Sequence, residues 1–172
     1  IAAWEAAVAG LPVELTELTG PCTLPAIERA LRRGYHALHF VGHGAYIESA
    51  GAALYLADDA NKMKLARAEE LAAMLSRLAG PDNALQLVFL GSCQTAETSP
   101  ADAFRGLAPQ LLQAGVPAVL AMQDLVGVLT YSAFAQAFYR QLMQHGEVDL
   151  AVNQARSALL TAKLPGAAIP VL

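Results

Sequence analysis

The segment LQLVFLG, residues 85–91, is the feature that most restricts the fold of this chain. It is an almost uninterrupted apolar run, which is typical of a central strand whose two faces are both covered. The segments YHALHFV at 35–41 and PAVLAM at 117–122 are also strand-like. We therefore expect a sheet that is buried on both sides.

Helical segments alternate with these strands along the chain. We expect further strands at 11–18, where LPVELTEL alternates apolar and polar residues, and within 52–61, where a short strand runs into an Asp/Asn turn. The expected helices are 24–33 after an N-cap at Thr23, 66–79, 102–114, 127–144 and 148–163. This alternation predicts an α/β fold with an open, mostly parallel sheet and helices on both faces.

The composition limits the class of protein. Of 172 residues, 55 % are hydrophobic and 15 % are charged, which favours a packed globule over a disordered chain. We expect a single domain over residues 1–172, and the strand-like end GAAIPVL indicates a piece of a longer polypeptide. A net charge of −4 with scattered basic residues argues against a nucleic-acid partner. The short apolar runs, the two cysteines and the lack of a leader indicate a cytoplasmic protein without a membrane segment.

Several conspicuous residues are expected to be structural. Tyr131, Phe134 and Phe138 recur on one face of the helix predicted at 127–144, as core residues do. Cys22 lies in a GPCT turn with no histidine in its segment. The Asp-Asp pair at 58–59 is read as a solvated turn, with contact to a substrate as the alternative.

Two loops carry residues that can do chemistry. VGHGAY follows the strand at 35–41 and GSCQTA follows the strand at 85–91, so neighbouring strands would bring His43 and Cys93 to one edge of the sheet. Only a thiolate attacks a carbonyl, and a nearby histidine promotes its formation. The backbone N–H groups of Gly44 and Cys93 are the proposed oxyanion donors, and Gly42 is expected to adopt backbone angles closed to other residues.

Four blocks of the sequence together resemble a known family. LHFVGHG, LVFLGSCQTA, LLQAGVPAVLAMQ and FAQAFYRQLMQHGEVDLAVNQARSALL resemble the successive blocks of a CHAT domain, the caspase-like module often attached to tetratricopeptide repeats. The resemblance covers about residues 23–172. It implies a caspase-like three-layer sandwich and a His/Cys dyad formed by His43 and Cys93. These two residues are 50 apart, in agreement with the spacing in caspases.

The resemblance also suggests a substrate-binding residue. In separases an aspartate that follows a tryptophan lines the pocket for a basic residue on the amino side of the cut. Asp124, in AMQDLV, is the corresponding aspartate here, although this chain lacks the tryptophan. The caspase block QAC-x-G is replaced by GSCQTA, so a caspase substrate preference is not implied.

Other interpretations of the same residues stay open. His43 alone would be read as a strand-end histidine bonded to a backbone carbonyl, and Cys93 alone as an inert core thiol. A zinc site would use His36, His39, His43 and Cys93, but His36 and His39 are an odd number of residues apart and point to opposite faces of a strand. Ser92 lacks the G-x-S-x-G motif of a serine hydrolase. We expect no metal and no cofactor.

Two functional hypotheses remain. The first is a cysteine endopeptidase that cleaves a specific protein partner in a signalling or defence pathway. The second is a CHAT-like interaction or sensor module that has little peptidase activity until a partner rearranges its loops. The polar loop from Ser92 to Asp102 is the expected place for such a rearrangement. The family resemblance implies a protein or peptide substrate and tetratricopeptide repeats in the same polypeptide.

Overall fold

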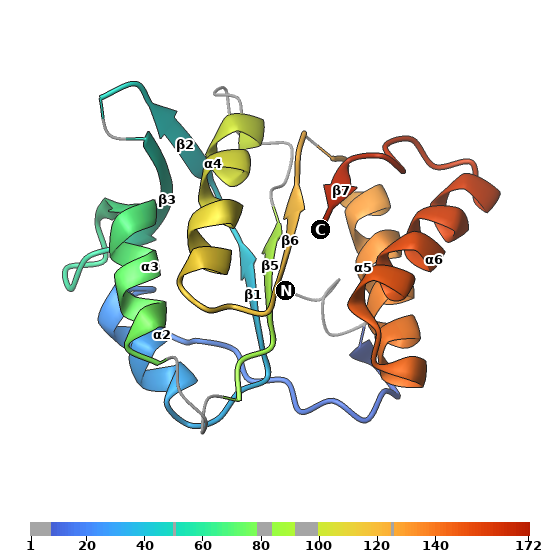
Figure 1. Cartoon of the computed structure of the whole chain (residues 1–172), viewed down its shortest axis with the longest axis horizontal. Coiled ribbons are helices and arrows are strands. Elements are labelled where there is room, and N and C mark those ends of the chain that lie inside the picture. The colour runs from blue at the N-terminus through green and yellow to red at the C-terminus, as the bar shows by residue number, and fades with distance from the viewer. Residues whose placement is uncertain (1–7, 50, 79–83, 92–99, 125) are drawn as a thin grey trace.

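The computed structural model describes residues 8–49, 51–78, 84–91, 100–124 and 126–172. Its elements, labelled as in Figure 1, are α2 Leu24–Leu31, β1 Ala37–Val41, β2 Gly44–Ile47, β3 Gly51–Ala57, β4 Met63–Arg67, α3 Ala68–Ser76, β5 Leu87–Gly91, α4 Pro100–Gln113, β6 Ala118–Met122, α5 Val128–His145, α6 Val148–Thr161 and β7 Pro170–Val171. The predicted α/β class is confirmed, and each of the five described helices agrees with an expected one to within three residues at either end.

The main sheet has the strand order β1-β5-β6-β7. β1 pairs in parallel with β5, and β5 pairs in parallel with β6. The short strand β7 pairs antiparallel with β6, so the sheet is mixed but mostly parallel. Because the parallel strands run the same way, β1, β5 and β6 all end at one edge of the sheet, at the top of Figure 1.

The sheet is covered on both faces, as its apolar sequence predicts. Alternate residues of β5 point in opposite directions: Val88 and Leu90 join a core with α2, α3 and α4, while Leu87 and Phe89 join a second core with α5 and α6. All five residues of β5 are buried. Figure 1 shows α5 and α6 on one side of the sheet and α2, α3 and α4 on the other.

The short strand predicted within residues 52–61 is confirmed as β3, but the small antiparallel sheet β2-β3-β4 that it forms is an addition to the expected fold. The helix predicted to begin at residue 66 begins at Ala68, because residues 63–67 form β4 and pair with β3. The predicted Asp/Asn turn is present: Oδ1 of Asp58 accepts the N–H groups of Ala60 and Lys62, at 2.9 and 2.8 Å, and closes the β3–β4 hairpin. The turn interpretation of residues 58–59 is therefore confirmed.

The strand predicted at residues 11–18 is wrong. These residues form no strand and are mostly exposed. An alternating pattern gives a strand only where a neighbouring strand accepts its hydrogen bonds, and residues 11–18 pair with no strand of either described sheet.

The ends of two helices follow the chemistry of their sequences. Oγ1 of Thr23 accepts the N–H of Ala26 at 3.2 Å, so the predicted N-cap of α2 is confirmed. Gly146 ends α5 with φ of 75°, in the left-handed region that glycine adopts without strain. Among the described residues, no helix is long and apolar enough to cross a membrane.

Candidate active site

The carboxyl ends of β1 and β5 lie side by side. The last pair in their register is Val41 with Gly91, and the N–H of Gly42 donates to the carbonyl of Gly91 at 3.1 Å. The two strands that precede the candidate loops are therefore neighbours, as the sequence analysis required. Pairing at this edge holds through residue 42 on one strand and residue 91 on the other.

His43 lies between β1 and β2, directly beyond this edge. Its carbonyl accepts the N–H of Tyr55 at 2.9 Å, so its backbone is bound to β3 while the residue is exposed. A histidine with a fixed backbone and an exposed side chain is accessible to a substrate.

Gly44 is the first residue of β2 and is buried. The bond from Tyr55 to His43 makes these two a hydrogen-bonded pair of the antiparallel ladder, so the next pair, Gly44 with Leu54, is a non-hydrogen-bonded pair. The N–H of Gly44 is consequently directed away from β3. This direction suits an oxyanion donor, but the burial of Gly44 keeps solvent from it.

The expected reason for glycine at position 42 is wrong. Gly42 and Gly44 are not among the described glycines with positive φ. The constraint at Gly42 is space, because a Cβ atom there would lie 2.5 Å from Cζ of Phe40. The ring of Phe40 folds over Gly42, and no larger residue fits without displacing it.

The other predicted site residues divide into two groups. Ser92, Cys93 and the following residues to 99 lie outside the described residues, and α4 begins at Pro100. Asp124 is described: it is exposed and follows β6 by two residues. Since β6 neighbours β5 in parallel, Asp124 lies at the same edge of the sheet as His43.

A polar cluster that the sequence analysis did not predict lies beneath this edge. The imidazole of His39, on β1, contacts two hydroxyl groups of α5: Nδ1 is 3.0 Å from the hydroxyl of Tyr139, and Nε2 forms a short hydrogen bond with that of Tyr131. Burial lowers the pKa of His39 to about 3, so the ring is neutral near pH 7. Burial, followed by the neighbouring Tyr131, raises the pKa of Tyr139 well above its usual value.

The ring of His39 also stacks within the second core. It lies 4.2 Å from the ring of Phe89, centroid to centroid, and 5.9 Å from that of Tyr139. The sequence offered only a weak indication that His39 packs against α5. It is a histidine within an apolar strand, at a position whose side chain points to the side of the sheet that α5 covers.

The residues considered for zinc are separated. His36 is exposed and precedes β1, whereas His39 is held by α5, and His43 lies beyond the strand. The described part of the chain contains no group of three His, Cys, Asp or Glu side chains placed to hold a metal ion. Cys22 is half-buried, and burial raises the pKa of its thiol, which makes it a poor nucleophile.

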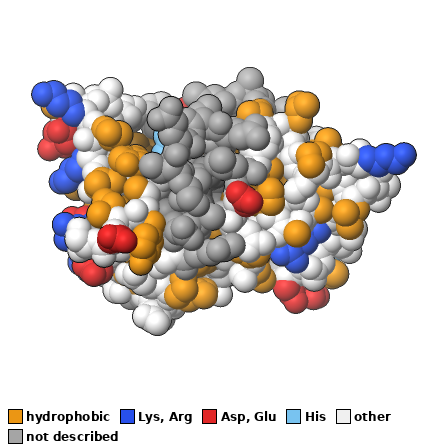
Figure 2. All heavy atoms as spheres, turned by 90° about the horizontal axis from the view of Figure 1, so that it is seen from above, with side chains coloured by type: hydrophobic (Ala, Val, Ile, Leu, Met, Phe, Trp, Pro, Cys, Tyr) orange, Lys and Arg blue, Asp and Glu red, His pale blue; other side chains and the backbone are white. Residues whose placement is uncertain are grey.

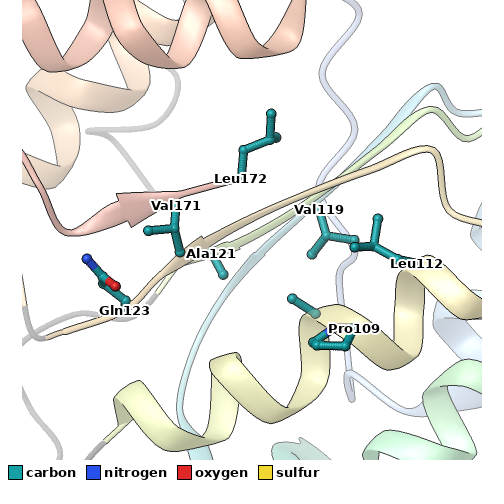
Figure 3. A pocket seen from close by; sticks show the side chains of 8 residues that line it. Pro109, Leu112, Val119, Ala121, Gln123, Val171 and Leu172 are labelled. Carbon is teal, nitrogen blue, oxygen red and sulfur yellow. The ribbon is translucent and has the colours of Figure 1, made fainter.

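The apolar pocket in Figure 3 is lined by none of these residues. It is lined by Ala108, Pro109, Leu112, Val119, Ala121, Gln123, Val171 and Leu172. α4 forms one wall, and β6 and β7 form the other. The pocket contains no ionisable side chain, so it offers no acid, base or nucleophile.

Figure 2 looks onto the edge at which β1, β5 and β6 end. Acidic and basic side chains lie side by side at the left of this view and more singly at the right, and hydrophobic side chains are visible on both sides. Two large side chains that flank His43 in the sequence are exposed, Val41 by 55 % and Tyr46 by 56 %. A molecule bound at this edge would therefore meet apolar as well as polar groups.

The family described as the CHAT domain matches residues 5–166. The matched range contains β1, β5 and β6 with the loops that follow them, and hence His43, Cys93 and Asp124. No curated protein matches the chain.

Proposed function

The chain belongs to the CHAT domain family, a caspase-like peptidase family, and on this premise we propose that it is a cysteine endopeptidase with a His43/Cys93 dyad. Its substrate would be a specific protein partner in a signalling or defence pathway. We also propose, from the family, that tetratricopeptide repeats adjoin this domain in the same polypeptide, and, from the low cysteine content, that the protein works in the cytoplasm.

In this mechanism Cys93 is the nucleophile. Its thiolate attacks the scissile carbonyl carbon, and the negative charge that develops on the oxygen is held by the N–H groups of Gly44 and Cys93. The imidazolium of His43 gives its proton to the leaving amine as the peptide bond breaks. His43, now neutral, takes a proton from water as that water attacks the thioester, which releases the acyl product and restores the Cys93 thiolate and the His43 imidazolium.

The register of the sheet is the observation that carries this proposal. Residues of β1 pair with residues of β5 that are 50 positions later, the same separation as between His43 and Cys93. Each of the two therefore follows the last pair, Val41 with Gly91, by two residues. Neighbouring parallel strands are about 4.8 Å apart, so residues that leave them at matching positions begin within reach of each other.

The same count supports a role for Asp124 in substrate binding. β5 residues pair with β6 residues 31 positions later, which is the separation between Cys93 and Asp124. A carboxylate one strand beyond the nucleophile would favour an Arg or Lys at P1, the residue before the cut. Fluorogenic peptides with Arg, Lys, Met, Asn or Asp at P1 test this, with Asp124→Asn as the variant. Equal cleavage of basic and neutral peptides would contradict it.

The burial of Gly44 favours a second candidate function. A carbonyl oxygen reaches the Gly44 N–H only after neighbouring groups move, as in a module that a partner activates. Such a module would act as a sensor or interaction domain in its resting form. Comparing peptidase activity with and without the adjoining repeat regions distinguishes the two candidates, because a partner-activated module becomes active only in the longer protein.

Cysteine alkylation tests the dyad without a known substrate. Iodoacetamide labelling across pH, mapped by mass spectrometry, should modify Cys93 well below pH 8 in the wild type and much more slowly in His43→Ala. His36→Ala is the matched control, because this exposed histidine precedes β1 and its loss should change nothing. Cys22 is an internal reference, since its raised pKa predicts slow labelling in every variant. A Cys93 that reacts as an ordinary thiol in both proteins would refute the assembled dyad.

Once a substrate is found, cleavage itself tests the assignment. Cys93→Ala and His43→Ala should each lower kcat by roughly 10⁴-fold or more, since nucleophile and base act as one unit. Both variants should keep the wild-type circular dichroism spectrum. Retained cleavage in either variant would show that another group performs the chemistry.

A further inference from the structure

One side chain, Tyr131 of α5, contacts both strands that precede the candidate dyad. Its hydroxyl bonds to Nε2 of His39 on β1, and its ring lies against Gly91 at the end of β5. His39 lies four residues before His43, and Gly91 two residues before Cys93.

The contact at Gly91 is close. A Cβ atom added to Gly91 would lie 2.7 Å from both Cε2 and Cζ of the Tyr131 ring, closer than non-bonded carbon atoms approach. Gly91 therefore has no room for a side chain while Tyr131 is in place. The same residue accepts, through its carbonyl, the N–H of Gly42 at 3.1 Å. Tyr131 thus packs against the residue that makes the last bond between β1 and β5.

The bond to His39 fixes the direction of the Tyr131 side chain. A neutral imidazole has one donor and one acceptor nitrogen, so one tyrosine hydroxyl donates to the ring and the other accepts from it. Tyr139 occupies Nδ1 at 3.0 Å, which leaves Nε2 for Tyr131. Tyr131 itself is buried, with 8 % of its surface exposed, and its ring packs 6.0 Å from that of Phe89.

We propose that Tyr131 is a positioning residue for the dyad: it anchors the carboxyl end of β5 to β1 through Gly91 and His39, and so sets the place from which Cys93 leaves the sheet relative to His43. The effect on the dyad rests on the proposed function, but the contacts of Tyr131 with Gly91 and His39 are a property of the fold.

The test compares Tyr131→Phe with Tyr139→Phe. Each variant removes one hydroxyl that bonds to His39, and Tyr131 is the one whose side chain lies nearest to the Cβ position of Gly91. In Tyr131→Phe the amide of Gly42, which bonds to Gly91, should exchange with deuterium about five- to tenfold faster, and Cys93 alkylation at pH 7 should slow by a similar factor. In Tyr139→Phe both rates, corrected for global stability, should stay within about twofold of the wild type.

A second pair of variants tests the packing contact. Gly91→Ala should displace the Tyr131 ring and slow Cys93 alkylation, and adding Tyr131→Leu should restore part of the rate because the shorter side chain makes room. A double variant no faster than Gly91→Ala would contradict the packing role.

The outcomes separate this inference from the proposed function. If Cys93 shows no His43-dependent reactivity, the proposed dyad fails, while the exchange of the Gly42 amide still decides whether the anchor exists. If the dyad is confirmed but Tyr131→Phe and Tyr139→Phe change both readouts equally, Tyr131 is an ordinary core residue and the positioning role is overturned.

Discussion

At the scale of single residues, His39 is the most informative side chain. It lies in an apolar strand, yet both of its ring nitrogens have hydroxyl partners on α5. A buried polar group without partners costs stability, so these bonds explain how the core accepts an imidazole. His39 is a residue of β1, so its bond to Tyr131 connects the strand that leads to His43 with the helix α5.

The lowered pKa of His39 predicts acid sensitivity. The unfolded chain binds a proton on this ring near pH 6.5, but the folded protein does so only near pH 3. The contribution of the neutral imidazole to the free energy of unfolding is therefore fully present above pH 6.5. It falls by up to about 1.4 kcal/mol per pH unit as the pH decreases towards 3. His39→Gln, whose amide can still bond to both tyrosines, should be less stable at pH 7.5 but show a shallower decline.

Urea unfolding at pH 7.5, 6 and 5 measures this difference. The matched control is His36→Gln, at an exposed position before β1, which should retain the pH dependence of the wild type. If the stability of His39→Gln declined with pH as steeply as that of the wild type, the neutral buried imidazole would not be the cause.

At the scale of elements, the sequence predicted the helices and strands whose pattern of apolar residues reflects their burial. β5 was recognisable because it is apolar on both faces, and α5 because its aromatic residues recur on one face. β4 was missed because Lys64 and Arg67 are exposed and its pairing depends on β3, to which the Asp58 turn connects it. The strand predicted at residues 11–18 failed for the opposite reason, since its pattern suited a strand but none of the described strands pairs with it.

The candidate site was predictable only in part. The GHG and GSC loops were identified because each follows an apolar strand, and the parallel register agrees with that reading of the strands. The bond between His39 and Tyr131 joins residues 92 positions apart. No local pattern marks such a pair, because a histidine in a strand and a tyrosine on an aromatic helix face each look like core residues.

The end of α5 gives a prediction about an element boundary. Gly146 has φ of 75°, and a Cβ atom there would meet nothing within 4 Å, so only backbone strain opposes a substitution. Gly146→Ala should lower the free energy of unfolding by roughly 1–2 kcal/mol, whereas Gly146→Asn should cost less, because asparagine tolerates the left-handed region better. Urea unfolding of the two variants measures this order. Equal losses would mean that the conformation is not what requires glycine.

At the scale of the whole molecule, one sheet separates two cores. β5 and β6 supply side chains to both, so a loss of packing on one face should weaken the entire structure. Leu111, on α4, and Leu159, on α6, are each 1 % exposed and lie in opposite cores. Leu111→Ala and Leu159→Ala should each cost about 2–5 kcal/mol.

The decisive measurement is amide hydrogen exchange, in each variant, on the side of the sheet opposite to the substitution. If the molecule unfolds as one unit, the slowest amides of α5 lose as much protection in Leu111→Ala as those of α4 do, because both exchange through global unfolding. Loss confined to α4 would contradict this and mean that the α5–α6 layer opens separately. In that case the contacts of Tyr131 with His39 and Gly91 could break while the rest of the sheet stays folded, and the dyad would be controlled by the docking of α5.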